Sequence, residues 1–352
     1  MVTTVWVLAF VCMLWVLLIR LPAGSEAHMP MPYMIALVPF MWIPLLAVAV
    51  WSAAVQAWAP MCLCLAWLTV ACDSAIEYRM AKLPKWMAQP TPALKLPVGP
   101  STEPMENAFR AARKAIEEAA EAGHAEDRRV MTLNCRYGRA DAAAIVDAVR
   151  GRNIDVLALQ ECNDALVGRL NEAGLGAVMP YMQQGEGKAT DNGGFNVLFT
   201  REEPVGRQLS AANIPAADVP AMTLMIAGRE VTFASAHPKS PMRGCPDWSA
   251  GIIGLSVLAQ EAIAEDHDVA VVMGDLNSQI EHPSFRMLLA SGFRDASLTV
   301  ANGRHTTFPS WLPWPRIELD HVLFTPGALP VDVESFVVPG TDHLALTATL
   351  RF

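Results

Sequence analysis

Charged residues are scarce in this chain: Asp, Glu, Lys and Arg make up 17% of its 352 residues, whereas soluble domains contain about 25%. Two stretches, residues 1–19 and 27–72, contain none of the four. Together with a hydrophobic content of 53%, these stretches exclude a simple cytosolic globule. The length leaves room for one large domain or two ordinary ones.

Two further absences narrow the class of protein. No basic residue precedes the N-terminal apolar run, which argues against a cleavable signal peptide. The seven cysteines form no Cys-x-x-Cys pair, and no histidine cluster is present, which argues against a zinc site. We interpret Cys135 and Cys162 as small buried side chains, with a disulfide between them as the alternative.

The uncharged stretches themselves indicate membrane helices. A helix needs about 20 apolar residues to cross the hydrocarbon core of a bilayer. Residues 2–19 form one such run, and residues 34–51 and 58–75 form two more with a short break between them. We predict that residues 1–80 are a transmembrane region of about three helices, with two helices as the alternative. The protein is then a multi-pass protein of the cell membrane.

Residues 81–127 are predicted to connect this region to a folded domain. Six prolines between residues 83 and 104 favour an extended, semi-rigid spacer. Residues 105–127 are rich in Ala, Glu, Arg and Lys, which predicts a solvated helix that holds the following domain off the bilayer.

From residue 128 onward, short apolar runs alternate with turns and polar helices. A helix is predicted at 140–150, and strands are predicted at 130–133, 155–159, 196–200, 230–236, 269–273, 321–324 and 345–350. Strands interleaved with helices over residues 128–352 predict one α/β domain with a substantial core.

Polar side chains stand at the ends of these strands. Asn134, Glu161, His237, Asp275 and Asn277 each follow a strand, and Asp320, Asp342 and His343 open one. Carboxylates and carboxamides are hard oxygen ligands of the kind that Mg²⁺ prefers, and a nearby histidine can move a proton. The pattern indicates a candidate cation site, and such an ion neutralises phosphate charge and can lower the pKa of a bound water.

The ordered set Asn…Gln-Glu…His…Gly-Asp-x-Asn…Asp…Asp-His resembles the endonuclease/exonuclease/phosphatase superfamily over residues 128–352, in particular its membrane-anchored bacterial members. That superfamily includes pancreatic deoxyribonuclease, abasic-site endonucleases, inositol polyphosphate 5-phosphatases and bacterial sphingomyelinases. The resemblance implies an α/β fold in which a two-sheet sandwich is flanked by helices, here preceded by the membrane region.

The resemblance also implies Mg²⁺ or Mn²⁺ as the cofactor. By similarity, Glu161 is the principal metal ligand, Asn134 lies beside it, and Asp342 completes or supports the metal sphere. Asp275 and Asn277 match the pair that positions the attacking water and a phosphate oxygen.

Two histidines complete the implied machinery. His343 matches the residue that activates the water or contacts the scissile phosphate, and Asp320 matches the carboxylate that orients it. Glu318 competes for that second role, because the sequence here reads Arg-Ile-Glu-Leu-Asp where the family has Arg-Ile-Asp. His237 matches a phosphate binder or a proton donor to the leaving oxygen.

The substrate class stays open: nucleic acid, a lipid headgroup or a small organophosphate. Residues 128–352 contain 18 Lys and Arg against 25 Asp and Glu, a net charge of −7, which disfavours tight duplex binding. Residues 307–314 resemble a Thr-aromatic-Pro element of membrane-anchored members, or form a hydrophobic loop that touches lipid. Six basic residues near the motif loops are candidates for phosphate contacts or for surface ion pairs: Arg136, Arg139, Lys188, Lys239, Arg243 and Arg316.

We therefore predict a membrane-anchored, divalent-metal-dependent phosphoric ester hydrolase that cleaves a phosphodiester or phosphomonoester by attack of water. No protein partner is inferred. The alternative is a non-catalytic, membrane-tethered binding module on the same fold. Transport is disfavoured, because the predicted spans carry no charged residue in their interiors.

Two arguments about which side of the membrane carries the domain conflict with each other. Arg20, Arg79, Lys82 and Lys85 lie on the side of the domain, and the positive-inside rule assigns that side to the cytoplasm. Similar three-span bacterial members carry the domain outside. Because the charge bias consists of only these four residues, we give the similarity more weight and expect an extracytoplasmic domain.

Overall fold

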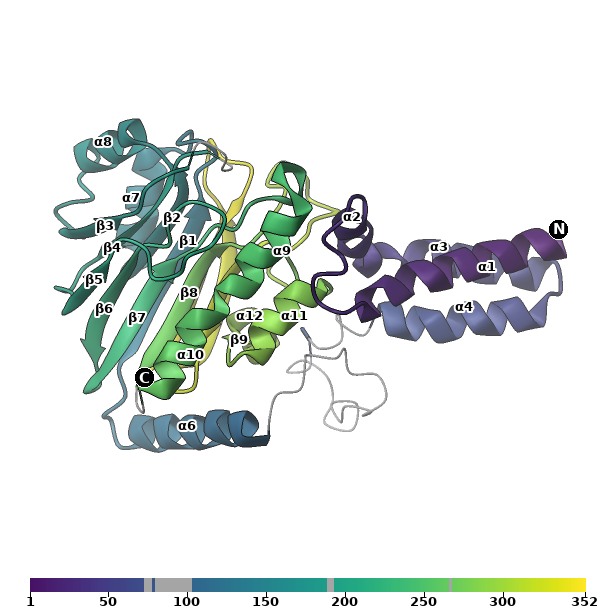
Figure 1. Cartoon of the computed structure of the whole chain (residues 1–352), viewed down its shortest axis with the longest axis horizontal. Coiled ribbons are helices and arrows are strands. Elements are labelled where there is room, and N and C mark those ends of the chain that lie inside the picture. Colours follow the sequence, from purple (N-terminus) through teal and green to yellow (C-terminus); the bar gives the residue numbers. More distant parts are fainter. Residues whose placement is uncertain (73–77, 80–102, 189–192, 266–267) are drawn as a thin grey trace.

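The computed structural model describes residues 1–72, 78–79, 103–188, 193–265 and 268–352. The predicted proline-rich spacer lies outside these ranges except for residues 103 and 104. Figure 1 shows a two-layer sandwich of β-sheets and a group of N-terminal helices that projects from one side of it.

The first sheet contains six strands among the described residues: β1 (Asp127–Asn134), β2 (Val156–Cys162), β3 (Tyr181–Gln184), β4 (Phe195–Thr200), β11 (Leu329–Val337) and β12 (Leu344–Arg351). Their order is β11-β12-β1-β2-β4-β3. β1 and β2 are parallel, and the other neighbours are antiparallel.

The second sheet also contains six described strands: β5 (Gly206–Gln208), β6 (Ala221–Ile226), β7 (Arg229–Ser235), β8 (Val269–Asp275), β9 (Arg294–Asp295) and β10 (Asp320–Phe324). Their order is β5-β6-β7-β8-β10-β9. β7 and β8 are parallel, and β10 runs antiparallel to β8.

Apolar side chains fill the space between the sheets and cover their outer faces. Val130, Phe233, Met273 and Leu346 belong to the buried cluster between the two layers. Helices α7 (Ala142–Gly151) and α8 (Asp164–Glu172) pack on the first sheet, and α9 (Cys245–Gly254), α10 (Ser256–Ala264) and α11 (Pro283–Ala290) pack on the second. The prediction of a two-sheet sandwich flanked by helices is confirmed.

Five strands were not predicted from the sequence. β3 and β5 are short edge strands, β9 has two residues, and β11 is an edge strand with Pro330 at an irregularity of its pairing. The inner strand β6 reads Ala-Met-Thr-Leu-Met-Ile, a composition without a clear strand preference. Its pairing between β5 and β7 and its burial, rather than propensity, make it a strand.

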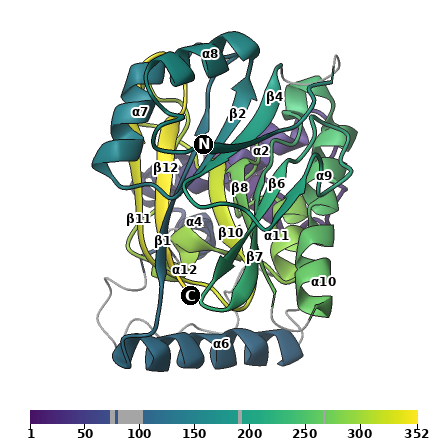
Figure 2. The same cartoon turned by 90° about the vertical axis from the view of Figure 1, so that its left-hand side faces the viewer.

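Helix α6 (Glu103–Glu121) differs from the solvated spacer that its composition predicted. Phe109 and Ile116 are buried, and the Phe109 ring meets Phe324 edge-on at 6.1 Å. Arg294 pairs with Glu106 at 2.7 Å and lies over the Phe109 ring. Figure 2 shows the helix lying across one end of the sandwich. A few apolar side chains are therefore enough to dock a helix that is otherwise polar.

The N-terminal region contains the helices α1 (Val2–Leu17), α2 (Met31–Ala36), α3 (Trp42–Ala54) and α4 (Trp58–Ala71). Among the described residues, the stretch Val2–Arg20, with a mean hydropathy of 2.6, is long and apolar enough to cross a membrane. Met31–Phe40 and Trp42–Ala54 together pass the same test but are bent by 63°, and α4 has 14 residues. The predicted span at 34–51 is divided into α2, a short 3-10 turn at Val38–Phe40 and α3, because Pro39 interrupts it near its start; the end of the predicted span at 58–75 lies outside the described residues. The number of spans stays a prediction.

Candidate active site

The predicted polar residues lie at one edge of the sandwich because of how the strands pair. The parallel strands β1 and β2 end there, β1 with Asn134 and β2 with Glu161 and Cys162, and β8 ends there with Asp275. The antiparallel strands β10 and β12 begin there. Twelve residues line an open cavity of about 270 Å³ at this edge: Asn134, Arg136, Tyr137, Glu161, Ser240, Met242, Arg243, Asp275, Asn277, Phe308, Asp342 and His343.

Asn134 joins the two buried carboxylates of the cavity. Its side-chain amide donates to Oε1 of Glu161 at 3.2 Å and to Oδ2 of Asp275 at 2.9 Å. The backbone N–H of Tyr137 donates to the other oxygen of Glu161 at 3.0 Å. Carboxylates from both sheets are thereby held side by side under one cavity.

The backbone around this centre adopts unusual conformations. Glu161 and Asn277 have φ angles of 52° and 49°, in the left-handed region that residues other than glycine rarely occupy. A Cβ atom at Gly274 would collide with the carbonyl oxygen of Ala236, so a glycine is required before Asp275. Such strain is concentrated at functional sites, where the surrounding fold imposes it.

Two histidines approach the carboxylates from the second sheet and from β12. Nε2 of His237 lies 3.5 Å from Oδ2 of Asp275 and 3.8 Å from Oε1 of Glu161. Nδ1 of His343 is 2.7 Å from Oδ2 of Asp320. Nε2 of His343 lies 3.6 Å from Oδ2 of Asp275. Asp320 therefore fixes the orientation of a ring whose other nitrogen is directed at the cavity centre.

Burial and close charges change the acidities in this centre. Burial, with Asp275 nearby, raises the pKa of Glu161 above its ordinary value. Burial alone would also raise the pKa of Asp275, but His343 and His237 outweigh it and the pKa is lowered. Burial opposes protonation of His343, yet Asp320 and Asp275 raise its pKa to about 10. The two carboxylates therefore favour the protonated, imidazolium form of the His343 ring.

Asn277 and Asp342 occupy the mouth of the cavity. The backbone N–H of Asn277 donates to Oδ1 of Asp275 at 2.8 Å, and its side-chain amide donates to the carbonyl of Pro238 at 3.0 Å. Asp342 is 3.5 Å from Nε of Arg136. Asp342 is thus the most accessible carboxylate of the predicted set.

The structure brings all eight predicted site residues together. Six line the cavity, and His237 and Asp320 contact the lining residues Asp275 and His343. Of the six basic candidates, Arg136 and Arg243 line the cavity. The other four have other contacts: Arg139 lies over the Tyr137 ring, Lys188 donates to a carbonyl, Lys239 pairs with Asp247, and Arg316 donates to the carbonyls of Pro309 and Ser310.

Two threonines support the site, Thr341, to which the sequence assigned no role, and Thr307, which it indicated only as part of the Thr-aromatic-Pro element. The Thr341 hydroxyl donates to the carbonyl of Asn134 at 2.6 Å and accepts from the backbone N–H of His343 at 3.2 Å. The Thr307 hydroxyl accepts from the backbone N–H of Asp320 at 3.2 Å. The hydrogen bonds of these hydroxyls depend on contacts between segments far apart in the sequence, so only the fold shows their supporting role.

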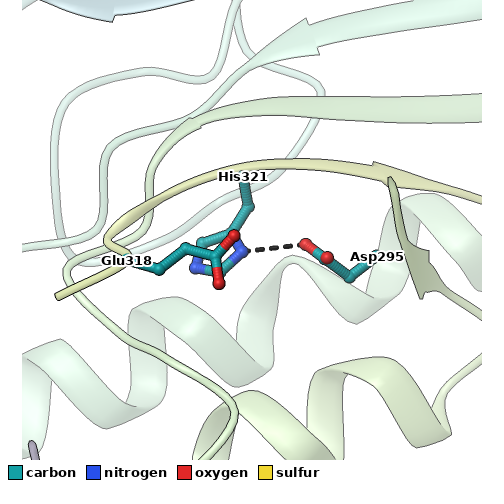
Figure 3. A group of neighbouring side chains, drawn as sticks. All are labelled: Asp295, Glu318 and His321. Carbon is teal, nitrogen blue, oxygen red and sulfur yellow. Dashed lines mark hydrogen bonds and ion pairs between the residues drawn. The ribbon is translucent and has the colours of Figure 1, made fainter. Parts of the chain in front are cut away.

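Glu318, the competitor for the role of Asp320, lies elsewhere. Figure 3 shows it with Asp295 and His321 in a separate buried group, whose ligand-type atoms lie within 4.8 Å of one another. Nδ1 of His321 lies 2.9 Å from Asp295, and Nε2 donates to the carbonyl of Ser278 at 2.9 Å. Both ring nitrogens are engaged, so His321 offers no free lone pair to a cation. We interpret this group as a buried charge network.

The structure also distinguishes between the two interpretations of Cys135 and Cys162. Both thiols are free and fully buried, and burial raises the pKa of Cys135. They pack in the core of the first sheet, in agreement with the interpretation as small buried side chains.

The charge network predicts a pH effect on stability. Burial, with Asp295 nearby, raises the pKa of Glu318 from 4.5 to about 7. The folded state then binds more protons than the unfolded state between these values, so the free energy of unfolding falls as pH rises from about 4.5 to 7. Glu318→Gln is expected to remove this slope and to stabilise the protein at pH 8 by about 3 kcal/mol.

This effect is measured by urea unfolding of the full chain in detergent from pH 5 to 8. His321, whose pKa is raised to about 9 against burial by Asp295, adds a second loss of stability between about 6.5 and 9. The window from pH 5 to 6.5 therefore separates Glu318 from His321, and the difference in slope between the wild type and Glu318→Gln separates it from other carboxyls such as Glu161, whose pKa is also raised. The exposed Glu203 provides the matched control, Glu203→Gln. An unchanged slope in Glu318→Gln would contradict the assignment.

The donor set of the cavity suits a hard divalent cation. Glu161 and Asp275 are buried carboxylates that share the amide of Asn134, and Asp342 adds a third carboxylate at the mouth. The donors include no sulfur, and oxygen-only sets favour Mg²⁺ or Mn²⁺. The residues present therefore fit the predicted cofactor.

Comparisons with known proteins agree with this architecture. The model of the Endonuclease/Exonuclease/phosphatase family matches residues 131–343. No curated protein matches the chain in a sequence search.

Solved structures share the fold at low sequence identity. An endonuclease/exonuclease/phosphatase from Bacteroides vulgatus is 18% identical with a TM-score of 0.51, covering 64% of this chain and 98% of that one. A family protein from Bacteroides thetaiotaomicron is 16% identical with a TM-score of 0.51, covering 65% and 96%. The humanized D. rerio TDP2 is 16% identical with a TM-score of 0.50, covering 64% and 98%.

Proposed function

This chain belongs to the endonuclease/exonuclease/phosphatase family, and from that premise we propose that it is a divalent-metal-dependent phosphoric ester hydrolase held at a membrane by its N-terminal helices. One observation carries the proposal. Glu161 and Asp275, joined by Asn134, share a cavity with the imidazolium of His343. Buried anionic oxygens beside a cationic donor suit a cation and a phosphate group at once.

Glu161, with Asn134 beside it and Asp342 at the mouth, would hold Mg²⁺ or Mn²⁺. The ion supplies neutralisation of phosphate charge and lowers the pKa of a bound water.

The protein's own residues then position the reactants. His343, held by Asp320 through a 2.7 Å hydrogen bond, donates to a phosphate oxygen, where charge develops in the transition state. Asp275 and Asn277 orient the attacking water, and Asp275 accepts its proton. The water oxygen bonds to phosphorus as the bond from phosphorus to the leaving oxygen breaks. His237 in its protonated form donates to that oxygen.

Membrane attachment is supported by the apolar surface of the N-terminal helices. Leu14 is 59% exposed, Val50 62% and Trp58 61%, although α1, α3 and α4 pack on one another through Val5, Leu45 and Cys64. Apolar surface of this extent is costly in water, about 25 cal/mol per Å², and is relieved inside a bilayer. The predicted extracytoplasmic side is testable with a C-terminal reporter that is active only outside the cytoplasm.

The function is tested on the purified full chain in detergent with bis-p-nitrophenyl phosphate. We expect hydrolysis with Mg²⁺ or Mn²⁺, loss of hydrolysis with EDTA, and recovery when the cation is restored. If calorimetry detects no Mg²⁺ binding and no ester is cleaved, the non-catalytic binding module becomes the better description.

A further inference from the structure

One loop runs from the catalytic cavity to the N-terminal helices. The ring of Phe308 lies 5.0 Å from His343, and Trp311 meets Phe308 edge-on at 5.9 Å. The rings of Trp314 and Phe40 meet edge-on at 5.8 Å. Phe40 lies two residues before the start of α3. A short aromatic segment therefore connects the rim of the cavity to the base of the apolar helices.

The backbone of this loop is fixed while its apolar side chains are exposed. Ser310 donates from its N–H to the carbonyl of Asp342 at 2.8 Å and from its hydroxyl to the carbonyl of Thr341 at 2.9 Å. Trp311 is 62% exposed, Leu312 37% and Trp314 58%. We call these three residues the aromatic lip. Exposed indoles on a rigid loop are typical of a membrane interface.

Buried polar contacts hold the N-terminal region against the domain in one orientation. Oε1 of the buried Glu26 accepts from the backbone N–H of Ser284 at 2.6 Å and from its hydroxyl. The Gln279 amide donates to the carbonyl of Ala36 at 3.0 Å. Nε2 of His282 lies 2.9 Å from the carbonyl of Pro32.

These contacts come from the segment that directly follows Asp275 and Asn277. The buried apolar cluster also continues without interruption from α1 and α3 to α9 and α11. The cavity is therefore positioned relative to the apolar helices by the fold itself. Trp42 is 40% exposed at the start of α3, close in sequence to Phe40, which contacts Trp314, so a bilayer around those helices with Trp42 at its interface would have its surface beside the aromatic lip.

We propose that the substrate is a membrane phospholipid, whose phosphoric ester enters the cavity from the bilayer surface across the aromatic lip. The inference rests on the proposed hydrolase function and names the substrate class for the same site. The lip inserts at the interface and lets a headgroup reach His343 without the lipid leaving the membrane. Residues 128–352 carry a net charge of −7, which favours a membrane lipid over a polyanionic nucleic acid.

The experiment uses the full chain in nanodiscs made from phosphatidylcholine, phosphatidylethanolamine and phosphatidylglycerol with Mg²⁺. Lipid cleavage is followed by mass spectrometry, and hydrolysis of soluble bis-p-nitrophenyl phosphate is followed on the same preparation. The double variant Trp311→Ser/Trp314→Ser is expected to lower the ratio of lipid rate to soluble rate by about tenfold or more. Trp311→Phe/Trp314→Phe should retain most of that ratio, because phenylalanine still inserts. Met225→Ser removes a distant exposed apolar side chain and should leave both rates unchanged.

A second measurement keeps the test independent of how the double variant folds. Tryptophan fluorescence of the wild type and of Trp311→Phe is compared in ordinary nanodiscs and in nanodiscs with brominated phosphatidylcholine, which quenches indoles in contact with lipid. The intensity difference between the two proteins, which reports Trp311, should shrink in the brominated discs.

Three results would overturn the inference: soluble ester hydrolysis without lipid cleavage, faster cleavage of a single-stranded DNA oligonucleotide than of lipid, or an undiminished Trp311 signal in brominated discs. If no ester of either kind is cleaved, it is the proposed hydrolase function that fails.

Discussion

Replacing His343 with alanine is expected to lower kcat on bis-p-nitrophenyl phosphate by about 10³-fold. The ring is buried, its Nδ1 is held 2.7 Å from Asp320, and its Nε2 lies 3.6 Å from Asp275. With its pKa raised to about 10, it presents a positive donor to the cavity. Removing a preorganised donor or proton carrier from a reacting phosphate costs about 10²–10⁴ in rate. The measurement is steady-state hydrolysis with saturating Mg²⁺.

Two companion variants distinguish a catalytic loss from a folding defect. His124→Ala removes an exposed histidine shortly after the end of α6 and should leave kcat unchanged. Asp320→Asn keeps the shape of the orienting residue but removes its charge, so an intermediate loss of about 10–10²-fold is expected. A kcat for His343→Ala within a factor of about three of the wild type would exclude this histidine from the reaction.

The sequence predicts the composition of this site well, because its residues stand where strands end. Asn134, Glu161 and Asp275 follow three predicted strands, and parallel pairing of β1 with β2 brings the first two to the same edge. The sequence does not indicate the backbone conformation that directs these side chains toward the cavity. The left-handed φ of Glu161 lies at an irregularity in the pairing of β2 with β4, where a Cβ at the neighbouring Gly194 would collide with the carbonyl of Cys162.

In the N-terminal region, the sequence predicts the helices but not how they pack on the domain. The length of the apolar stretches predicts membrane helices, and this prediction depends only on local composition. The contact of Glu26 with Ser284 joins residues 258 positions apart, and no local pattern reports it. Glu26 interrupts the charge-free stretches and reads as a loop residue, yet it is completely buried against α11. Only the structure therefore shows that these helices dock onto the domain.

The second large effect is expected for Glu161→Gln, which should abolish the response to divalent cations. Glu161 is buried, and its two oxygens accept from Asn134 and from the Tyr137 backbone. Glutamine has nearly the same size, but it offers one neutral acceptor in place of a carboxylate, so the attraction for a cation is lost. We expect a fall in kcat/KM of about 10³-fold or more, equivalent to about 4 kcal/mol of transition-state stabilisation.

Cation binding provides a readout for this variant that does not depend on turnover. A ligand that binds only the folded state raises stability by RT ln(1 + [L]/Kd), so Mg²⁺ should raise the Tm of the wild type and leave that of Glu161→Gln unchanged. Glu172→Gln, an exposed position on α8, should behave as the wild type in both assays. Burial raises the pKa of Glu161, so the neutral amide removes a cost of burying charge, but glutamine can accept only one of the two hydrogen bonds from Asn134 and the Tyr137 backbone; because these two effects oppose each other, the stability of the variant without the cation is measured alongside. A variant that is stable, correctly folded and still activated by Mg²⁺ would show that the cation is held by other residues of the cavity, with Asp275 the next carboxylate to test.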